Sequence, residues 1–133
     1  RGWRAIGVDF SPVAIRKARA AARGLPGAHF IEGDATRLSQ LDIPEPITLA
    51  IDMGGFHSLP DEGKSAYVAE LARVLEPGTP LMLWQGIGLK PGEIAEAFGR
   101  QFVIERSKAK DFDIKRKMFH RSITGEWYWL RRR

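Results

Sequence analysis

The feature that most constrains this chain is a short strand that passes through a tight turn directly into a helix. Arg4 to Phe10 (RAIGVDF) is a mostly apolar run of the kind expected for a strand covered on both faces. Ser11 is a good helix N-cap and Pro12 a good first helical residue, and apolar residues then recur at helical spacing up to Gly24. A strand covered on both faces needs helices on both sides of its sheet, which predicts an α/β layered fold.

The same alternation continues to the C-terminus. Further strands are expected at residues 28–32, 47–53, 80–84, 102–107 and 126–130, and helices at 61–75 and 91–98. Residues 108–125 lack clear periodicity and are interpreted as a connection that brings the last strand back antiparallel. The 133 residues are the length of one domain, so a single domain over 1–133 is expected.

Composition excludes several functional classes. The chain is 44% hydrophobic and 28% charged, as in ordinary globular proteins, and no apolar run is long enough to span a membrane. The absence of cysteine excludes disulfides, thiolate zinc sites and cysteine nucleophiles, and a cytoplasmic location is expected. His29 and His120 are isolated, so no metal site is expected.

The charge is uneven along the chain. Residues 1–99 hold 10 Lys and Arg against 12 Asp and Glu, whereas residues 100–133 hold 11 against 4, a balance of +7. Such a segment could bind nucleic acid. Its aromatic residues, including Phe102, Trp127 and Trp129, are expected in the core, however. We therefore favour a solvated basic face with weak, non-specific nucleic-acid binding at most.

Three carboxylates stand where predicted parallel strands end: Asp9, Asp34 and Asp52. Open parallel sheets bind ligands beyond the carboxyl ends of their strands. A carboxylate there can accept hydrogen bonds from both hydroxyls of a ribose. For each aspartate alone we favour the interpretation as a turn or helix cap, but the three together predict a ligand site.

Four segments occur in an order that resembles a known family. They are GVDFSPVAIRKA from Gly7, FIEGDATRL from Phe30, AIDMGGFHSLP from Ala50 and LARVLEPGTPLMLW from Leu71. In this the chain resembles the class I S-adenosylmethionine-dependent methyltransferases, particularly the small-molecule type. The resemblance implies a Rossmann-like three-layer sandwich with a mostly parallel sheet and an antiparallel last strand. It also implies S-adenosyl-L-methionine as cofactor and a small-molecule methyl acceptor.

The resemblance implies a role for each cofactor residue. Asp9 would accept from the ribose hydroxyls, and Phe10 would lie along the adenine. Asp34 would accept from the adenine amino group, while the backbone amide of Ala35 pairs with the ring. An NAD-dependent oxidoreductase is an alternative, since an acid after the second strand also suits the ribose of NAD.

The resemblance also implies a channel in which the methyl group meets its acceptor. Asp52, Met53 and Gly54 would line it, and Phe56 and His57 would shape its wall. Methyl transfer depends mainly on alignment, with a base needed only when the acceptor must lose a proton. His57 is the candidate base, although we favour its interpretation as a wall or hydrogen-bonding histidine.

The chain departs from the family at its start. The family carries a glycine-rich loop after a first strand that precedes everything seen here, so we expect an N-terminally truncated, inactive portion without that strand and helix. The strand at 4–10 is then expected to pair with the strand at 47–53, or with a neighbour in a homodimer or swapped assembly. A non-catalytic interaction module of methyltransferase ancestry remains an alternative.

Overall fold

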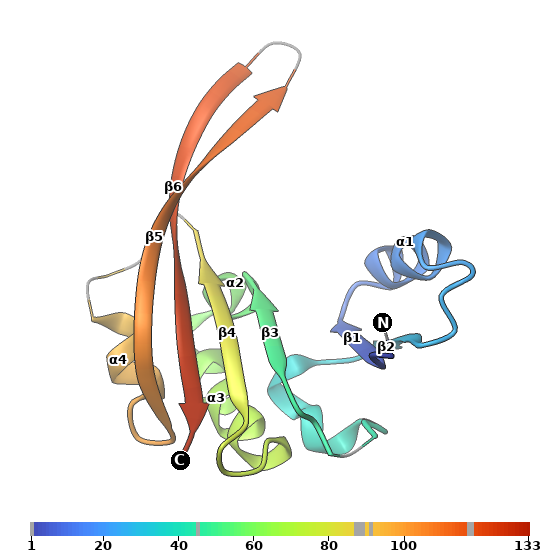
Figure 1. Ribbon diagram of the computed structural model, residues 1–133, viewed down its shortest axis with the longest axis horizontal. Helices are drawn as coiled ribbons and strands as arrows, with labels where there is room; N and C mark the ends of the chain where they lie inside the picture. The colour runs from blue at the N-terminus through green and yellow to red at the C-terminus, as the bar shows by residue number, and fades with distance from the viewer. Residues whose placement is uncertain (1, 45, 87–89, 91, 117–118) are drawn as a thin grey trace.

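The computed structural model describes residues 2–44, 46–86, 90, 92–116 and 119–133. Strands and helices alternate along the chain (Figure 1), which confirms the predicted α/β class. The elements are β1 (Ala5–Asp9), α1 (Pro12–Ala21), β2 (Ala28–Glu32), the 3-10 helix η1 (Ala35–Gln40), β3 (Ala50–Met53), α2 (Gly55–Ser58), α3 (Asp61–Val74), β4 (Pro80–Gln85), α4 (Glu93–Phe98), β5 (Phe102–Arg116) and β6 (Phe119–Arg132). No helix among the described residues is long and apolar enough to cross a membrane.

The first unit is a parallel pair of strands with one helix. β1 and β2 pair in register from Ala5 opposite Ala28 to Asp9 opposite Glu32. The Ala14 N–H donates to Ser11 Oγ at 3.3 Å, and Pro12 is the first helical residue. This confirms the start that the sequence predicted for α1, because both signals act within one turn of the chain.

The second unit is a four-stranded sheet in the order β3-β4-β6-β5. β3 and β4 are parallel, and β6 is antiparallel to both β4 and β5, as predicted for the last strand. Leu81 and Leu83 of β4 are at most 1% exposed and belong to one core cluster with Phe98 of α4 and Phe102 of β5. The core therefore lies between this sheet and the helices α2, α3 and α4, which lie behind the sheet in the view of Figure 1.

The interpretation of residues 108–125 as an irregular connection is wrong. β5 and β6 continue as an antiparallel ladder from Lys108 opposite Trp127 to Arg116 opposite Phe119. The ribbon projects beyond the rest of the sheet (Figure 1). Hydrogen bonds between the two strands define this ladder, and such pairing need not leave an apolar alternation in the sequence.

The C-terminal aromatic residues divide between the core and the opposite face of the sheet. Phe102 is fully buried, as predicted. Trp127 and Trp129 are only half-buried and lie outside the core cluster, so their prediction as core residues is wrong. Both pair with β4 residues on the face opposite the buried Leu81 and Leu83.

The expected pairing between the strands at 4–10 and 47–53 does not form. Among the described residues β1 pairs with β2 alone and β3 with β4 alone. The intervening η1 packs on α3, and the Ser39 N–H donates to the Glu70 carboxylate at 2.7 Å. Side-chain packing therefore holds this connection in place without backbone pairing between β1 and β3. Each of these two strands has one edge that is not hydrogen-bonded to another described strand.

Candidate functional site

Two of the predicted acids lie at one edge of the β1–β2 pair. Asp9 is the last residue of β1 and stands opposite Glu32. The Gly33 N–H donates to the Asp9 carbonyl oxygen at 3.0 Å, and Asp34 follows directly. The parallel register therefore brings Asp9 and Asp34 to the carboxyl edge of both strands, where ligands of open α/β sheets bind.

Each of these carboxylates uses one oxygen to hold its own turn. Asp9 Oδ1 accepts from the Ser11 N–H at 2.7 Å, and Asp34 Oδ1 accepts from the Thr36 N–H at 2.8 Å and the Thr36 hydroxyl at 2.7 Å. The bonds from Thr36 lower the pKa of Asp34, with a smaller contribution from the charge of Arg37. Both side chains are exposed. Asp9 Oδ2 is not used by its turn and can accept from a ligand, whereas Asp34 Oδ2 forms an exposed ion pair with Arg37, 3.9 Å from Arg37 Nε.

Phe10 and Ala35, the other two residues expected to contact the nucleoside, directly follow these acids in the sequence. Phe10 is 82% exposed. Exposure of an apolar ring to water costs free energy, and stacking on a bound aromatic ring would reduce that exposure. Ala35 is the first residue of η1, whose N-cap is Asp34. Carboxylates combined with an open aromatic face can bind a nucleoside, so this edge suits the ribose and base of a nucleotide-like cofactor.

Asp52 is directed inward rather than toward an open channel. Its side chain is 6% exposed and accepts from the Phe56 N–H at 2.9 Å and the Tyr67 hydroxyl at 2.7 Å, besides capping Gly55. Burial raises the pKa of Tyr67 well above its usual value, and the Asp52 charge adds to the effect. In this structure the carboxylate anchors α2 on α3.

Phe56 is directed inward as well. It is fully buried and packs edge-on against Phe98, with ring centroids 5.0 Å apart. Its ring therefore forms part of the core instead of a channel wall. Met53, next to Asp52 on the other face of β3, is 68% exposed.

His57 and Gly54 lie together at the carboxyl end of β3. Gly54 has a φ of 98°, and a Cβ there would lie 2.7 Å from His57 Cε1, so the imidazole can take its place only beside a glycine. The His57 ring packs edge-on against Trp84, with centroids 5.8 Å apart. Among the described residues, His57 Nδ1 is buried without a hydrogen-bond partner.

Sequence reasoning missed Gln85, which ends β4 beside this position. Its side chain is fully buried, and neither amide atom has a hydrogen-bond partner among the described residues. Unpaired buried polar groups are rare and need a reason. The available signal was a lone amide at the end of the apolar run LMLWQ.

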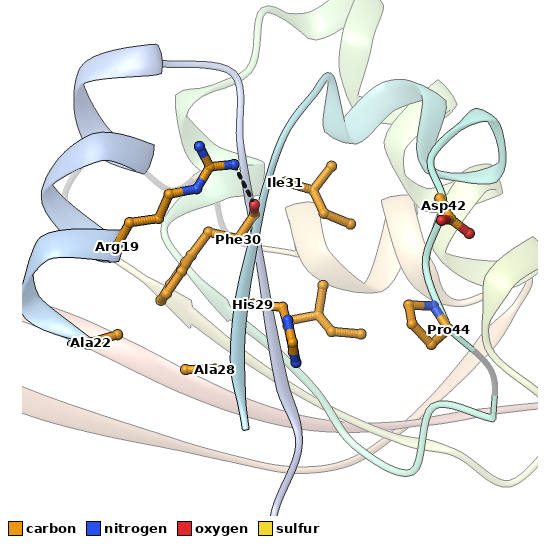
Figure 2. A pocket seen from close by; sticks show the side chains of 9 residues that line it. Arg19, Ala22, Ala28, His29, Phe30, Ile31, Asp42 and Pro44 are labelled. Carbon is orange, nitrogen blue, oxygen red and sulfur yellow. Dashed lines mark hydrogen bonds between the residues drawn. The ribbon is translucent and has the colours of Figure 1, made fainter. Parts of the chain in front are cut away.

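A cavity of about 530 Å³ lies elsewhere, at the outer edge of β2 (Figure 2). Arg19 of α1 extends along it and donates to the Phe30 carbonyl oxygen at 2.9 Å, while Asp42 and Pro44 form the opposite side. None of the predicted site residues lines it.

Comparison with known proteins agrees with this architecture. A family model described as a methyltransferase domain matches residues 1–78. One similar solved structure is described by the conversion of a disulfide bond into a thioacetal group during echinomycin biosynthesis. Its TM-score is 0.82 and its sequence identity is 23%, over 98% of this chain and 67% of that chain.

Two further structures show the same fold. A SAM-dependent methyltransferase from Methanosarcina mazei has a TM-score of 0.72 and 18% identity over 96% of this chain and 81% of its own. The N-methyltransferase NodS from Bradyrhizobium japonicum, in complex with S-adenosyl-L-homocysteine, has a TM-score of 0.73 and 11% identity over 97% of this chain and 66% of its own. The Rossmann-like fold predicted from the sequence is thus confirmed.

Proposed function

Because this chain belongs to the methyltransferase domain family, we propose that it forms part of an S-adenosylmethionine-dependent methyltransferase for a small-molecule acceptor. The observation that carries the proposal is the register of β1 and β2, which aligns Asp9 and Asp34 at one sheet edge. The complex of the similar N-methyltransferase with S-adenosyl-L-homocysteine supports this choice of cofactor.

The residues at this edge fit the nucleoside half of that cofactor. Asp9 Oδ2 would accept from the ribose hydroxyls and Asp34 from the adenine amino group, while Phe10 would cover the base. Bound S-adenosylmethionine supplies an electrophilic sulfonium methyl group. The sequence contains no GxGxG loop for the methionine end, so we expect weak binding and no measurable methyl transfer by these 133 residues alone.

The acceptor end is proposed at the carboxyl ends of β3 and β4. Met53, Gly54 and His57 are its candidates, since Asp52 and Phe56 are engaged in the core. Methyl transfer by in-line displacement would need alignment of the acceptor with the sulfonium methyl group above all. His57 would orient the acceptor, or take its proton where the acceptor must lose one.

Titration calorimetry with S-adenosyl-L-homocysteine tests the proposal. Asp9→Asn keeps an acceptor for the Ser11 N–H but removes the charge, and we expect it to weaken binding about tenfold or more, as for a lost charge-assisted hydrogen bond of about 1.5–3 kcal/mol. The control is Asp42→Asn, an exposed aspartate at the cavity edge, which should leave the affinity unchanged.

Two outcomes would contradict the proposal. Equal affinities for Asp9→Asn and the parent chain would remove Asp9 from the site. No binding by either, even at millimolar ligand, would favour the non-catalytic interaction module. The cytoplasmic location expected from the sequence stays a prediction.

A further inference from the structure

One face of the β5–β6 ribbon carries cations opposite indole rings. In the ladder Arg106 stands opposite Trp129, Lys108 opposite Trp127 and Lys110 opposite Gly125. Opposed residues of antiparallel strands share a face, so these side chains form one surface. We call it the cation–indole stripe and define it as Arg106, Lys108, Lys110, Trp84, Trp127 and Trp129.

The contacts confirm that these side chains meet. The Arg106 guanidinium lies 4.0 Å from the centroid of the Trp129 ring, and the Trp127 and Trp129 centroids are 6.4 Å apart. Trp84 extends the row from β4, because a Cβ on Gly125 would lie only 2.7 Å from Trp84 Nε1. The glycine opposite Lys110 thus provides the space for a third indole.

The carboxylates of this ribbon whose side chains the structure describes lie on the opposite face or pair with another residue. Asp111 accepts from Thr124 and Glu126 accepts from Tyr128, each at 2.7 Å, and these pairs alternate with the stripe residues on the opposite face. Glu105, at the irregularity in β5, forms an ion pair with Arg131. All three cations of the stripe are exposed.

We infer that the cation–indole stripe is a binding surface for single-stranded nucleic acid. The three cations would contact backbone phosphates, and the indole rings would stack on bases, the combination that recognises single strands without regard to sequence. Successive cations are two residues apart along one strand, or about 6.8 Å. That spacing suits an extended nucleic-acid strand in which indole rings stack between successive bases.

This inference reverses what the sequence favoured. The weak binding expected there rested on Trp127 and Trp129 lying in the core, and the structure places both outside the core cluster, half-buried on the face that carries the cations. The function goes beyond methyl transfer, and the stripe contains none of Asp9, Asp34 or His57.

Fluorescence anisotropy with a labelled 12-nucleotide uridine strand tests the surface. We expect micromolar binding, with log K falling against log salt at a slope of about −2 for three phosphate contacts. Lys108→Glu/Lys110→Glu should weaken binding at least tenfold. The matched control Arg16→Glu/Lys17→Glu makes the same charge change at exposed positions on α1 and should cost less than twofold.

A second pair of variants separates stacking from charge alone. Trp127→Leu should weaken binding of the uridine strand about fivefold or more, and Trp127→Phe should restore most of that affinity. Neither variant should alter the binding of inorganic polyphosphate, which has no bases. Circular dichroism checks that each variant folds. If Trp127→Leu does not fold, the variant Lys108→Glu/Lys110→Glu tests the surface instead. Equal losses in the α1 control, equal affinity for duplex, or no binding of the strand at low salt would overturn the inference.

Discussion

At the scale of single residues, the clearest lesson comes from the buried carboxylate of Asp52. It stands at the strand end where a ligand-binding acid was expected, yet the Tyr67 hydroxyl and the backbone of α2 take up its oxygens. A buried charge is stable only when it is hydrogen-bonded, so each of these donors contributes to folding. Asp9 and Asp34 differ because they remain exposed. Asp9 keeps one oxygen for a ligand, and the second oxygen of Asp34 forms an exposed ion pair with Arg37 at 3.9 Å.

Tyr67→Phe should therefore destabilise the chain by about 1–2 kcal/mol, since it removes a donor from a buried carboxylate. Urea unfolding measures the loss. The control is Tyr128→Phe, which removes a donor from the less buried Glu126 and should cost less.

Burial and a hydrogen bond to a carboxylate predict how each of the two tyrosines in the chain titrates. The pKa of Tyr67 is raised well above its usual value by burial, and burial with the Glu126 hydrogen bond raises the pKa of Tyr128 to about 12. Absorbance at 295 nm should thus show almost no tyrosinate in the folded chain at pH 10. Half-titration near pH 10 would contradict the contacts assigned to both residues.

At the scale of elements, one side chain fastens η1 to α3. Glu70 of α3 is 7% exposed, accepts from the Ser39 N–H at 2.7 Å and forms an ion pair with Arg73. Since η1 lies in the connection between β2 and β3, this contact sets where the first unit sits against the larger sheet.

Glu70→Ala should cost about 1–2 kcal/mol at pH 7, because the Ser39 N–H loses its acceptor. The Ser39 hydrogen bonds lower the pKa of Glu70 from its ordinary value of 4.5 in the folded chain. Its contribution is therefore present above pH 4.5 and is lost as the pH falls through the lower folded value.

Urea unfolding of Glu70→Ala and the parent chain at pH 7 and pH 3 measures this dependence, and the difference should shrink at pH 3. Glu76→Ala, an exposed glutamate just after α3, serves as the control. A difference that is the same at both pH values would show that Glu70 acts by packing alone.

At the scale of the whole molecule, the main feature is the division into two sheets. β1 and β3 each lack a second neighbour among the described residues. Ile51 and Met53 of β3 are 59% and 68% exposed. Open edges with apolar side chains favour pairing with another chain.

We accordingly predict that the 133-residue chain self-associates. Light scattering during size-exclusion chromatography should give a mass above the 14.9 kDa monomer that rises with concentration. Ile51→Lys/Met53→Lys should shift the population toward monomer, whereas the control Val13→Lys, at a 45% exposed position on α1, should not. A monomer at every concentration would contradict the prediction.

The sequence by itself determined the features that depend on neighbours along the chain. Ser11 and Pro12 begin α1 where predicted, β2 has the expected bounds, and Asp9 and Asp34 follow their strands. Capping, turn formation and strand periodicity act over a few residues, so they can be identified without knowing what packs on them.

Only the tertiary structure decided what depends on distant partners. The inward direction of Asp52 follows from Tyr67, and the position of Trp127 on the sheet face opposite the core follows from its register with β4 and β5. The length of the β5–β6 ribbon likewise comes from hydrogen bonds between strands rather than from an apolar pattern. Which face a side chain occupies is set by pairing and packing across the fold, and these contacts join residues far apart in the sequence.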